Sequence, residues 1–164
     1  MEDRAVVRPA IEYAEKKKSL DKKYENVIAM ALQLPDGRIV TGRSSRRMVA
    51  GAALILNAVK TLCNIPDEMM LLSADIIKTQ QTLKTEVLHK TKASLNVEEV
   101  LSALAMSAAV NPMAAMAIQT LSKLEGCQAH CTAILSKSDS DVFHDLGIDA
   151  TCEPEFSSNN LYLS

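Results

Sequence analysis

The chain has 164 residues, of which 48% are hydrophobic and 23% are charged, with a formal net charge of −2. This length and composition predict one globular domain over residues 1–164 and exclude a mainly disordered chain. Aromatic residues make up only 3% of the chain and Trp is absent, so we expect no base-stacking surface and no nucleic-acid partner.

The sequence gives no sign of a membrane or an oxidising compartment. No apolar run reaches the roughly 20 residues that span a bilayer. Four cysteines without a recognisable signal peptide are typical of reduced thiols. We therefore expect a cytoplasmic protein with no membrane partner.

Charge is unevenly distributed along the chain. Residues 1–47 carry a net charge of +4 and residues 48–164 carry −6. The basic excess includes a lysine cluster at 16–23, and the acidic excess lies late, at 139–155. Oppositely charged ends can promote self-association, although solvent-exposed charged faces are the more common explanation.

Hydrophobic periodicity predicts the elements of the first half. Residues 4–18 form an amphipathic helix. The apolar segments 26–34 and 39–41 flank Asp36-Gly37 and predict a β-hairpin. Residues 48–59 contain one polar residue, Asn57, so this helix is expected to be buried against a sheet.

Capping residues mark the helices that follow. Residues 69–72 are a short apolar run that predicts a buried strand, and residues 73–88 predict a helix of mixed polarity. Asn96, with Glu99 three residues later, predicts a capping box. Asn111 before Pro112 predicts another helix start.

The last third predicts a β-α-β segment. Residues 127–135 alternate like a strand, residues 138–146 predict a helix, and residues 148–152 predict a final strand. The tail from Pro154 is expected to be irregular. Together with the hairpin, this order predicts an α/β fold: a three-layer α/β/α sandwich with a mixed sheet.

Several motifs carry a family resemblance. A hairpin ending in Thr-Gly before a buried helix resembles the opening of the cytidine-deaminase-like fold. The motifs LPDGRIVTG, SLNVEEVLSALAMSAAVNP, LEGCQAH and LGIDATCEPEFSS resemble the C-terminal region of domain-of-unknown-function family 1846, also called uncharacterised protein family 0371. The resemblance implies a deaminase-like sandwich without an assigned activity. Members of the family also have a large N-terminal part that is absent here. The resemblance therefore implies that this chain is either an excised domain or a short stand-alone relative.

The resemblance raises zinc deaminase chemistry, and the residues argue against it. That chemistry needs a metal ligand and a Glu two residues later at the start of the buried helix, followed by a Cys-x-x-Cys pair. Here Val49 and Gly51 occupy the first two places and no Cys-x-x-Cys occurs. We therefore expect no metal, no cofactor and no zinc-dependent deamination.

Cys127, His130 and Cys131 are the one cluster with metal-ligating residue types. In a strand, the two cysteines would lie on one face and His130 on the other. They could not converge on one ion, and buried cysteines that act as small core residues are the better interpretation.

His130 and Thr132 belong to a stretch that resembles the family's Gly-Cys-x-x-His-x-Thr-His-x-Pro pattern, in which Ala133 replaces the second His and Leu135 the Pro. Together with Asn111 they are candidate cleft residues. The structural alternatives are a buried strand histidine and a helix cap, and the missing second imidazole weakens any family chemistry here.

The clearest candidate ligand site is the loop before the buried helix. It consists of Arg43, Ser44, Ser45, Arg46 and Arg47. Free backbone N–H groups and the helix dipole attract anions at this end, where arginines are unfavourable unless something negative is bound. The alternative is that the arginines simply point into water.

Two functional interpretations follow. The first is a non-catalytic assembly or ligand-binding module, whose partner is a second copy of the chain or the rest of a larger protein. The second is an enzyme or substrate-binding domain for an anionic, phosphorylated small molecule. The sequence identifies no catalytic residue for it.

Overall fold

A computed structural model describes residues 4–20 and 27–154, and the side chains of residues 17–20 are not described. The predicted irregular tail therefore lies outside the described residues from position 155 onward, as do Lys22 and Lys23 of the lysine cluster. Among the described residues, no helix is long and apolar enough to cross a membrane.

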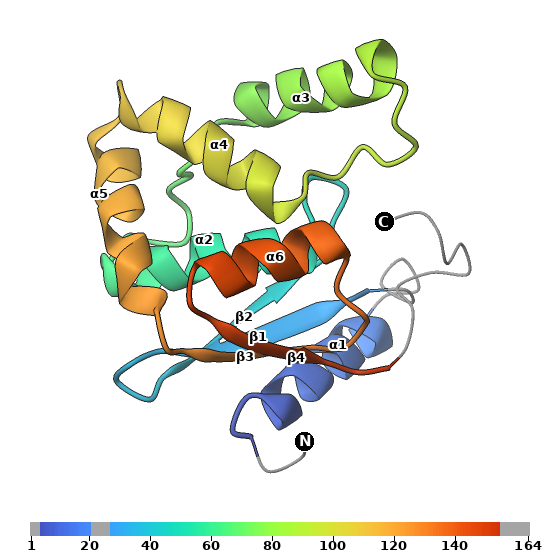
Figure 1. Cartoon of the computed structure of the whole chain (residues 1–164), viewed down its shortest axis with the longest axis vertical. Helices are drawn as coiled ribbons and strands as arrows, with labels where there is room; N and C mark the ends of the chain where they lie inside the picture. The colour runs from blue at the N-terminus through green and yellow to red at the C-terminus, as the bar shows by residue number, and fades with distance from the viewer. Residues whose placement is uncertain (1–3, 21–26, 155–164) are drawn as a thin grey trace.

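The described strands form one mixed sheet in the order β2-β1-β3-β4 (Figure 1). The strands are β1 (Ala29–Gln33), β2 (Ile39–Arg43), β3 (Gln128–Cys131) and β4 (Asp149–Cys152). β1 is antiparallel to both β2 and β3, whereas β3 and β4 are parallel. The predicted mixed sheet is confirmed.

The predicted hairpin is present and its turn follows from local chemistry. Gly37 has a φ of 93°, a left-handed conformation that favours glycine. The Asp36 carboxylate accepts hydrogen bonds from the backbone N–H and the Nε of Arg38. These contacts with Arg38 hold the pKa of Asp36 below its usual value.

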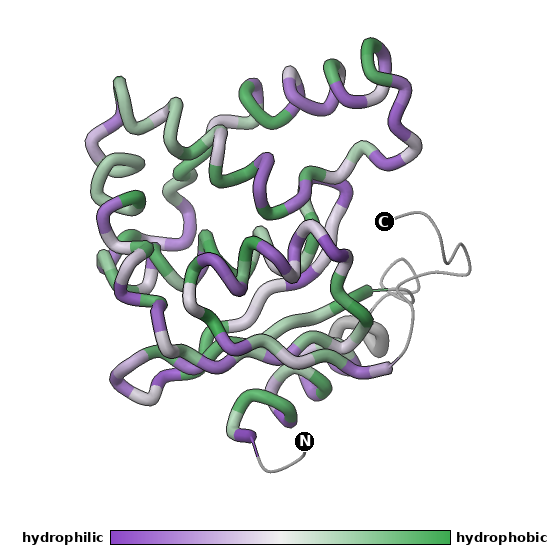
Figure 2. Tube along the Cα trace, in the orientation of Figure 1, coloured by the Kyte–Doolittle hydropathy of each residue, from purple (hydrophilic) through white to green (hydrophobic). Residues whose placement is uncertain are grey.

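Helices cover both faces of the sheet, as a three-layer α/β/α sandwich requires (Figure 1). α1 (Val7–Leu20) packs on one face, and α2 (Ala50–Leu62) and α6 (Lys137–Asp145) pack on the other. Figure 2 shows β1 hydrophobic along most of its length, whereas α6 alternates between hydrophilic and hydrophobic residues. The buried helix predicted at 48–59 is α2.

Gly42 allows α2 to approach the sheet closely. A Cβ atom at this position would lie 2.4 Å from the backbone nitrogen of Leu54. Backbone atoms in a helix cannot move aside cheaply, so β2 needs glycine here. This close contact fixes the position of α2, whose first turn becomes part of the site described below.

Three further helices extend the second helical layer. They are α3 (Ala74–Thr82), which continues as the π-helical turn η2 (Leu83–Val87), then α4 (Val97–Ala108), and α5 (Pro112–Thr120), which continues as the 3-10 turn η3 (Leu121–Leu124). α4 packs against α2, α5 and α6. The predicted capping box of Asn96 and Glu99 is confirmed, as is the Asn111 cap of α5.

Two predicted strands differ from the structure. Residues 69–72 form no strand but an irregular, bent segment, in which Met69 and Met70 are exposed while Leu71 and Leu72 are buried. The strand predicted at 127–135 is limited to β3, because the chain bends after Cys131 to reach α6.

Candidate functional site

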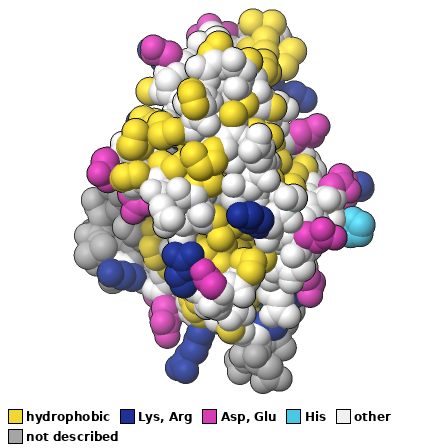
Figure 3. Space-filling view, turned by 90° about the vertical axis from the view of Figure 1, so that its left-hand side faces the viewer, with side chains coloured by type: hydrophobic (Ala, Val, Ile, Leu, Met, Phe, Trp, Pro, Cys, Tyr) yellow, Lys and Arg dark blue, Asp and Glu magenta, His cyan; other side chains and the backbone are white. Residues whose placement is uncertain are grey.

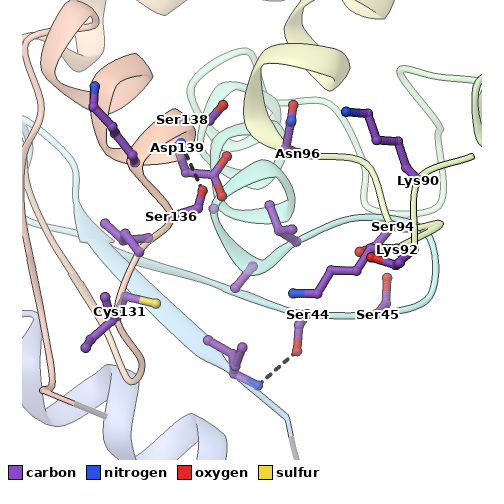
Figure 4. A pocket seen from close by; sticks show the side chains of 18 of the residues that line it. Ser44, Ser45, Lys90, Lys92, Ser94, Asn96, Cys131, Ser136, Ser138 and Asp139 are labelled. Carbon is purple, nitrogen blue, oxygen red and sulfur yellow. Dashed lines mark hydrogen bonds between the residues drawn. The ribbon is translucent and has the colours of Figure 1, made fainter. Parts of the chain in front are cut away.

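One cavity of about 470 Å³ lies where α2, α4 and α6 begin (Figure 4). Further walls come from the loop before α2 and from the connection between η2 and α4, at residues 90–94, and single residues of the sheet region and of η2 (Ile28, Cys131 and Lys84) complete the lining. Three helix starts meet there because α2 lies between the sheet and α4, while α6 packs against α4 and places Phe143 beside Gly51 of α2.

The amino end of α2 has no side-chain cap. Val49 occupies the N-cap position and makes no side-chain hydrogen bond to the helix. The N–H groups of the first turn have no intrahelical acceptor, and Ala50 and Gly51 of this turn line the cavity. This end of the cavity therefore presents hydrogen-bond donors and the positive end of a helix dipole.

The starts of α4 and α6 are joined by one buried carboxyl group. Asp139 is 5% exposed, and its Oδ1 accepts a hydrogen bond from the N–H of Val97 at 3.0 Å. Its own N–H donates to the hydroxyl of Ser136 at 3.1 Å. Burial raises the pKa of Asp139, although the hydrogen bond from Val97 opposes this shift. It is the one acidic residue among the described residues that line the cavity.

Lysines supply the positive charge of the cavity. The Nζ of Lys84 is occupied by the carbonyl oxygen of Ser94 and by Glu99, at 2.7 and 2.9 Å. The side chains of Lys90 and Lys92 make no hydrogen bond or ion pair with the described part of the chain. Figure 4 shows Lys92 extending toward Ser44 and Lys90 toward Asn96. Lys92 is half-buried, so its charge is less screened than that of a fully exposed lysine.

The predicted anion loop is divided by the structure. Ser44 and Ser45 line the cavity, and the Ser44 hydroxyl accepts a hydrogen bond from the N–H of Ile28 at 2.9 Å. Arg43, Arg46 and Arg47 are not among the lining residues. Arg46 and Arg47 are exposed, whereas Arg43 is half-buried. Whether the loop binds an anion remains a prediction, and the cations that line the cavity are lysines.

The three candidate cleft residues are not brought together. Asn111 caps α5 by accepting a hydrogen bond from the N–H of Met113 at 3.0 Å. His130 is fully buried, and its ring nitrogens lie 2.7 Å from the Thr151 hydroxyl and 2.9 Å from a Glu153 oxygen. The Thr132 hydroxyl accepts from the N–H of Ala29 at 3.0 Å. Each has a structural role, and none of the three lines the cavity.

The cysteines behave as the strand pattern predicts. Cys127 and Cys131 belong to the main hydrophobic core, whereas His130 pairs with Ala31, which packs on the α1 side of the sheet. Burial raises the pKa of Cys131 to about 12. Among the described residues, no group of three or more His, Cys, Asp or Glu side chains could hold a metal ion. Val49 and Gly51 line the cavity and offer no ligand.

Sequence reasoning missed Lys90, Lys92 and Ser94 as lining residues. Their position depends on tertiary contacts, because Leu95 forms a parallel bridge with Met48 and so brings the connection beside the start of α2. A local signal was present, since residues 88–95 contain two lysines and no acidic residue.

Comparison with known proteins identifies relatives over the whole chain. The family described as "Domain of unknown function DUF1846, C-terminal" matches residues 2–162. A UPF0371 protein of Clostridioides difficile strain 630 is 47% identical over 163 residues, covering 99% of this chain and 32% of its own length. A UPF0371 protein of Clostridium botulinum strain Langeland is 50% identical over 161 residues, with coverage of 98% and 32%.

The chain thus spans about a third of the length of the curated relatives it matches. The family match covers nearly all its residues, including every element that lines the cavity. This chain belongs to the DUF1846 family and corresponds to its C-terminal domain.

Proposed function

We propose that this domain is a ligand-binding module that holds a phosphorylated small molecule in the cavity between α2, α4 and α6. The observation that carries the proposal is Lys92, a half-buried lysine that lines the cavity and has no partner among the described residues. Burying a cation without a counter-charge is unfavourable. A bound anion would remove that cost.

The surrounding groups favour the same ligand. The uncapped first turn of α2 offers N–H donors from a second direction, and Lys90 adds a further positive charge. A hydrogen bond to a charged group contributes about 1.5–3 kcal/mol, and a helix amino end adds about 0.3–1 kcal/mol for a nearby anion. The carboxyl group of Asp139 opposes the binding of an anion, but it already accepts a hydrogen bond from the N–H of Val97.

The test is calorimetric titration of the purified chain with inorganic phosphate. The Lys92→Gln variant should bind phosphate about tenfold more weakly, because each lost charge-assisted hydrogen bond corresponds to about 1.4 kcal/mol or more. Lys123→Gln is the matched control, since Lys123 is exposed and does not line the cavity. Equal affinities for the wild type and Lys92→Gln, or no binding to the wild type, would overturn the proposal.

A second candidate function is assembly with another part of a longer protein or with a second copy. Three large hydrophobic side chains are exposed in the region of α4 and α5. They are Met106 on α4 (70% exposed), Val110 on the connection between α4 and α5 (88%) and Met116 on α5 (46%). Figure 3 shows hydrophobic side chains gathered on this side of the molecule. Exposed methionines suit adaptable contacts. Native mass spectrometry of the chain tests self-association, which Val110→Asp should weaken if this surface mediates it.

A further inference from the structure

We infer that the ligand of this cavity is a phosphorylated sugar or another phosphorylated polyol, and not a bare phosphate ion or a nucleotide held by its base. The inference rests on the proposed function, because it identifies the rest of the molecule to which the phosphate belongs. Three features of the cavity support it: its volume, its hydroxyl-bearing side chains and the residue types of its walls.

The volume exceeds what an isolated anion needs. Cavities that hold small organic ligands measure about 300–1,000 Å³, and this one measures about 470 Å³. A phosphate group held by Lys92 and the first turn of α2 would fill only part of this volume. The remaining space needs a carbon skeleton or several ordered water molecules to fill it.

Hydroxyl groups line much of this remaining space. They belong to Ser44, Ser45, Thr91, Ser94, Ser136 and Ser138. A serine or threonine hydroxyl both donates and accepts hydrogen bonds, as does each hydroxyl of a sugar. The Ser44 hydroxyl already accepts one backbone N–H, which leaves its proton available to donate into the cavity. Asn96 adds an amide whose oxygen is used by Glu99 and whose amino group has no partner among the described residues.

The apolar part of the wall fits a carbon chain better than a nucleobase. Val49, Ile134 and Leu135 are aliphatic, and none of the described lining residues is aromatic. Bases are commonly held by stacking on aromatic rings. The C–H groups of a sugar need only aliphatic contact, which these side chains supply.

These features also orient the ligand. The phosphate would lie between Lys92 and the start of α2, where the positive groups are. The hydroxyl groups of the ligand would then extend along Ser94 (Figure 4) and its neighbour Thr91, on the connection that leads to α4. Ser94 is suited to a test, because its backbone oxygen holds Lys84 and a change of its side chain leaves that bond in place.

The experiment is a set of calorimetric titrations with ribose 5-phosphate, inorganic phosphate and adenosine 5′-monophosphate. Ribose 5-phosphate should bind at least about tenfold more tightly than inorganic phosphate, which corresponds to about 1.4 kcal/mol. The monophosphate nucleotide should bind no more tightly than ribose 5-phosphate. Ser94→Ala should weaken binding of ribose 5-phosphate about threefold to tenfold and leave binding of inorganic phosphate unchanged. Ser122→Ala, an exposed serine on η3, is the control.

The possible failures are distinguishable. If inorganic phosphate binds as tightly as ribose 5-phosphate, the sugar inference is overturned while the proposed anion site stands. If the nucleotide binds tenfold more tightly than ribose 5-phosphate, the inference is also overturned, because the base then contributes. If none of the three compounds binds, the inference and the proposed function are both overturned.

Discussion

Asp139 connects the starts of α4 and α6, and its removal should destabilise the domain. In Asp139→Ala the N–H of Val97, a residue that is fully buried, loses its acceptor. An unsatisfied buried donor costs about 1–3 kcal/mol, and loss of a helix cap costs about 0.5–2 kcal/mol. Both energies refer to the loss of the same hydrogen bond, so they are not added together. We therefore expect Asp139→Ala to lower the free energy of unfolding by about 2 kcal/mol.

Asp139→Asn separates the hydrogen bond from the charge. An amide oxygen can still accept from Val97, and the cost of burying a carboxylate disappears. Because the folded-state pKa of Asp139 is raised, the folded protein holds this proton more tightly than the unfolded chain. The stability of the wild type should therefore fall as the pH rises from the usual carboxyl pKa through the raised value. Asp139→Asn should lack this contribution and equal or exceed the wild type at pH 7.

Urea unfolding of both variants at pH 7 measures these differences, provided that the transition is two-state. Asp141→Ala is the control, because Asp141 lies two residues away and pairs with Lys137 on the surface. An exposed pair of this kind contributes about 0–1 kcal/mol. If Asp139→Ala unfolds at the same urea concentration as Asp141→Ala, the bond between Asp139 and Val97 does not hold the two helix starts together.

Three further predictions concern the cavity and the core. Asp139→Asn should bind sulfate more tightly than the wild type at pH 7, and sulfate binding to the wild type should strengthen as Asp139 is protonated at lower pH. Equal sulfate affinities of the two proteins by calorimetry would argue against an electrostatic role for Asp139 in the cavity. Gly42→Ala should lower stability by about 2–3 kcal/mol through the clash with Leu54, and a neutral effect in urea unfolding would mean that α2 is less closely packed. His130→Ala should lower the free energy of unfolding by about 2–4 kcal/mol and leave the affinity for phosphate unchanged. A changed affinity for phosphate would show that His130 contributes to the site.

The sequence predicts best where short-range chemistry decides the structure. Asp36-Gly37 specifies a turn by conformation, and Asn96 with Glu99 caps a helix through bonds three residues apart. The run at 69–72 fails as a strand because four apolar residues do not determine which neighbours they pair with. Two of these residues are buried and two are exposed, as expected for a bent segment at the edge of the hydrophobic core.

The site was harder to predict because its parts come from distant segments. The sequence predicts free N–H groups at the start of the buried helix, and this helix start has no side-chain cap. The cations beside it are not predicted, because Lys92 reaches it through the contact of Leu95 with Met48. Arg46 and Arg47 are close in sequence but exposed to solvent. Proximity in sequence therefore indicates the helix end that lines the cavity, but not the lysines that line the cavity with it.

The central claim is that the anion binds at the uncapped start of α2. A phosphate titration of the ¹⁵N-labelled chain, followed by amide chemical shifts, tests this most directly. We expect the largest shifts at the amides of Ala50 and Gly51, with smaller ones at Lys92. Shifts that are largest at Arg46 and Arg47, or that are absent throughout the cavity, would contradict the account.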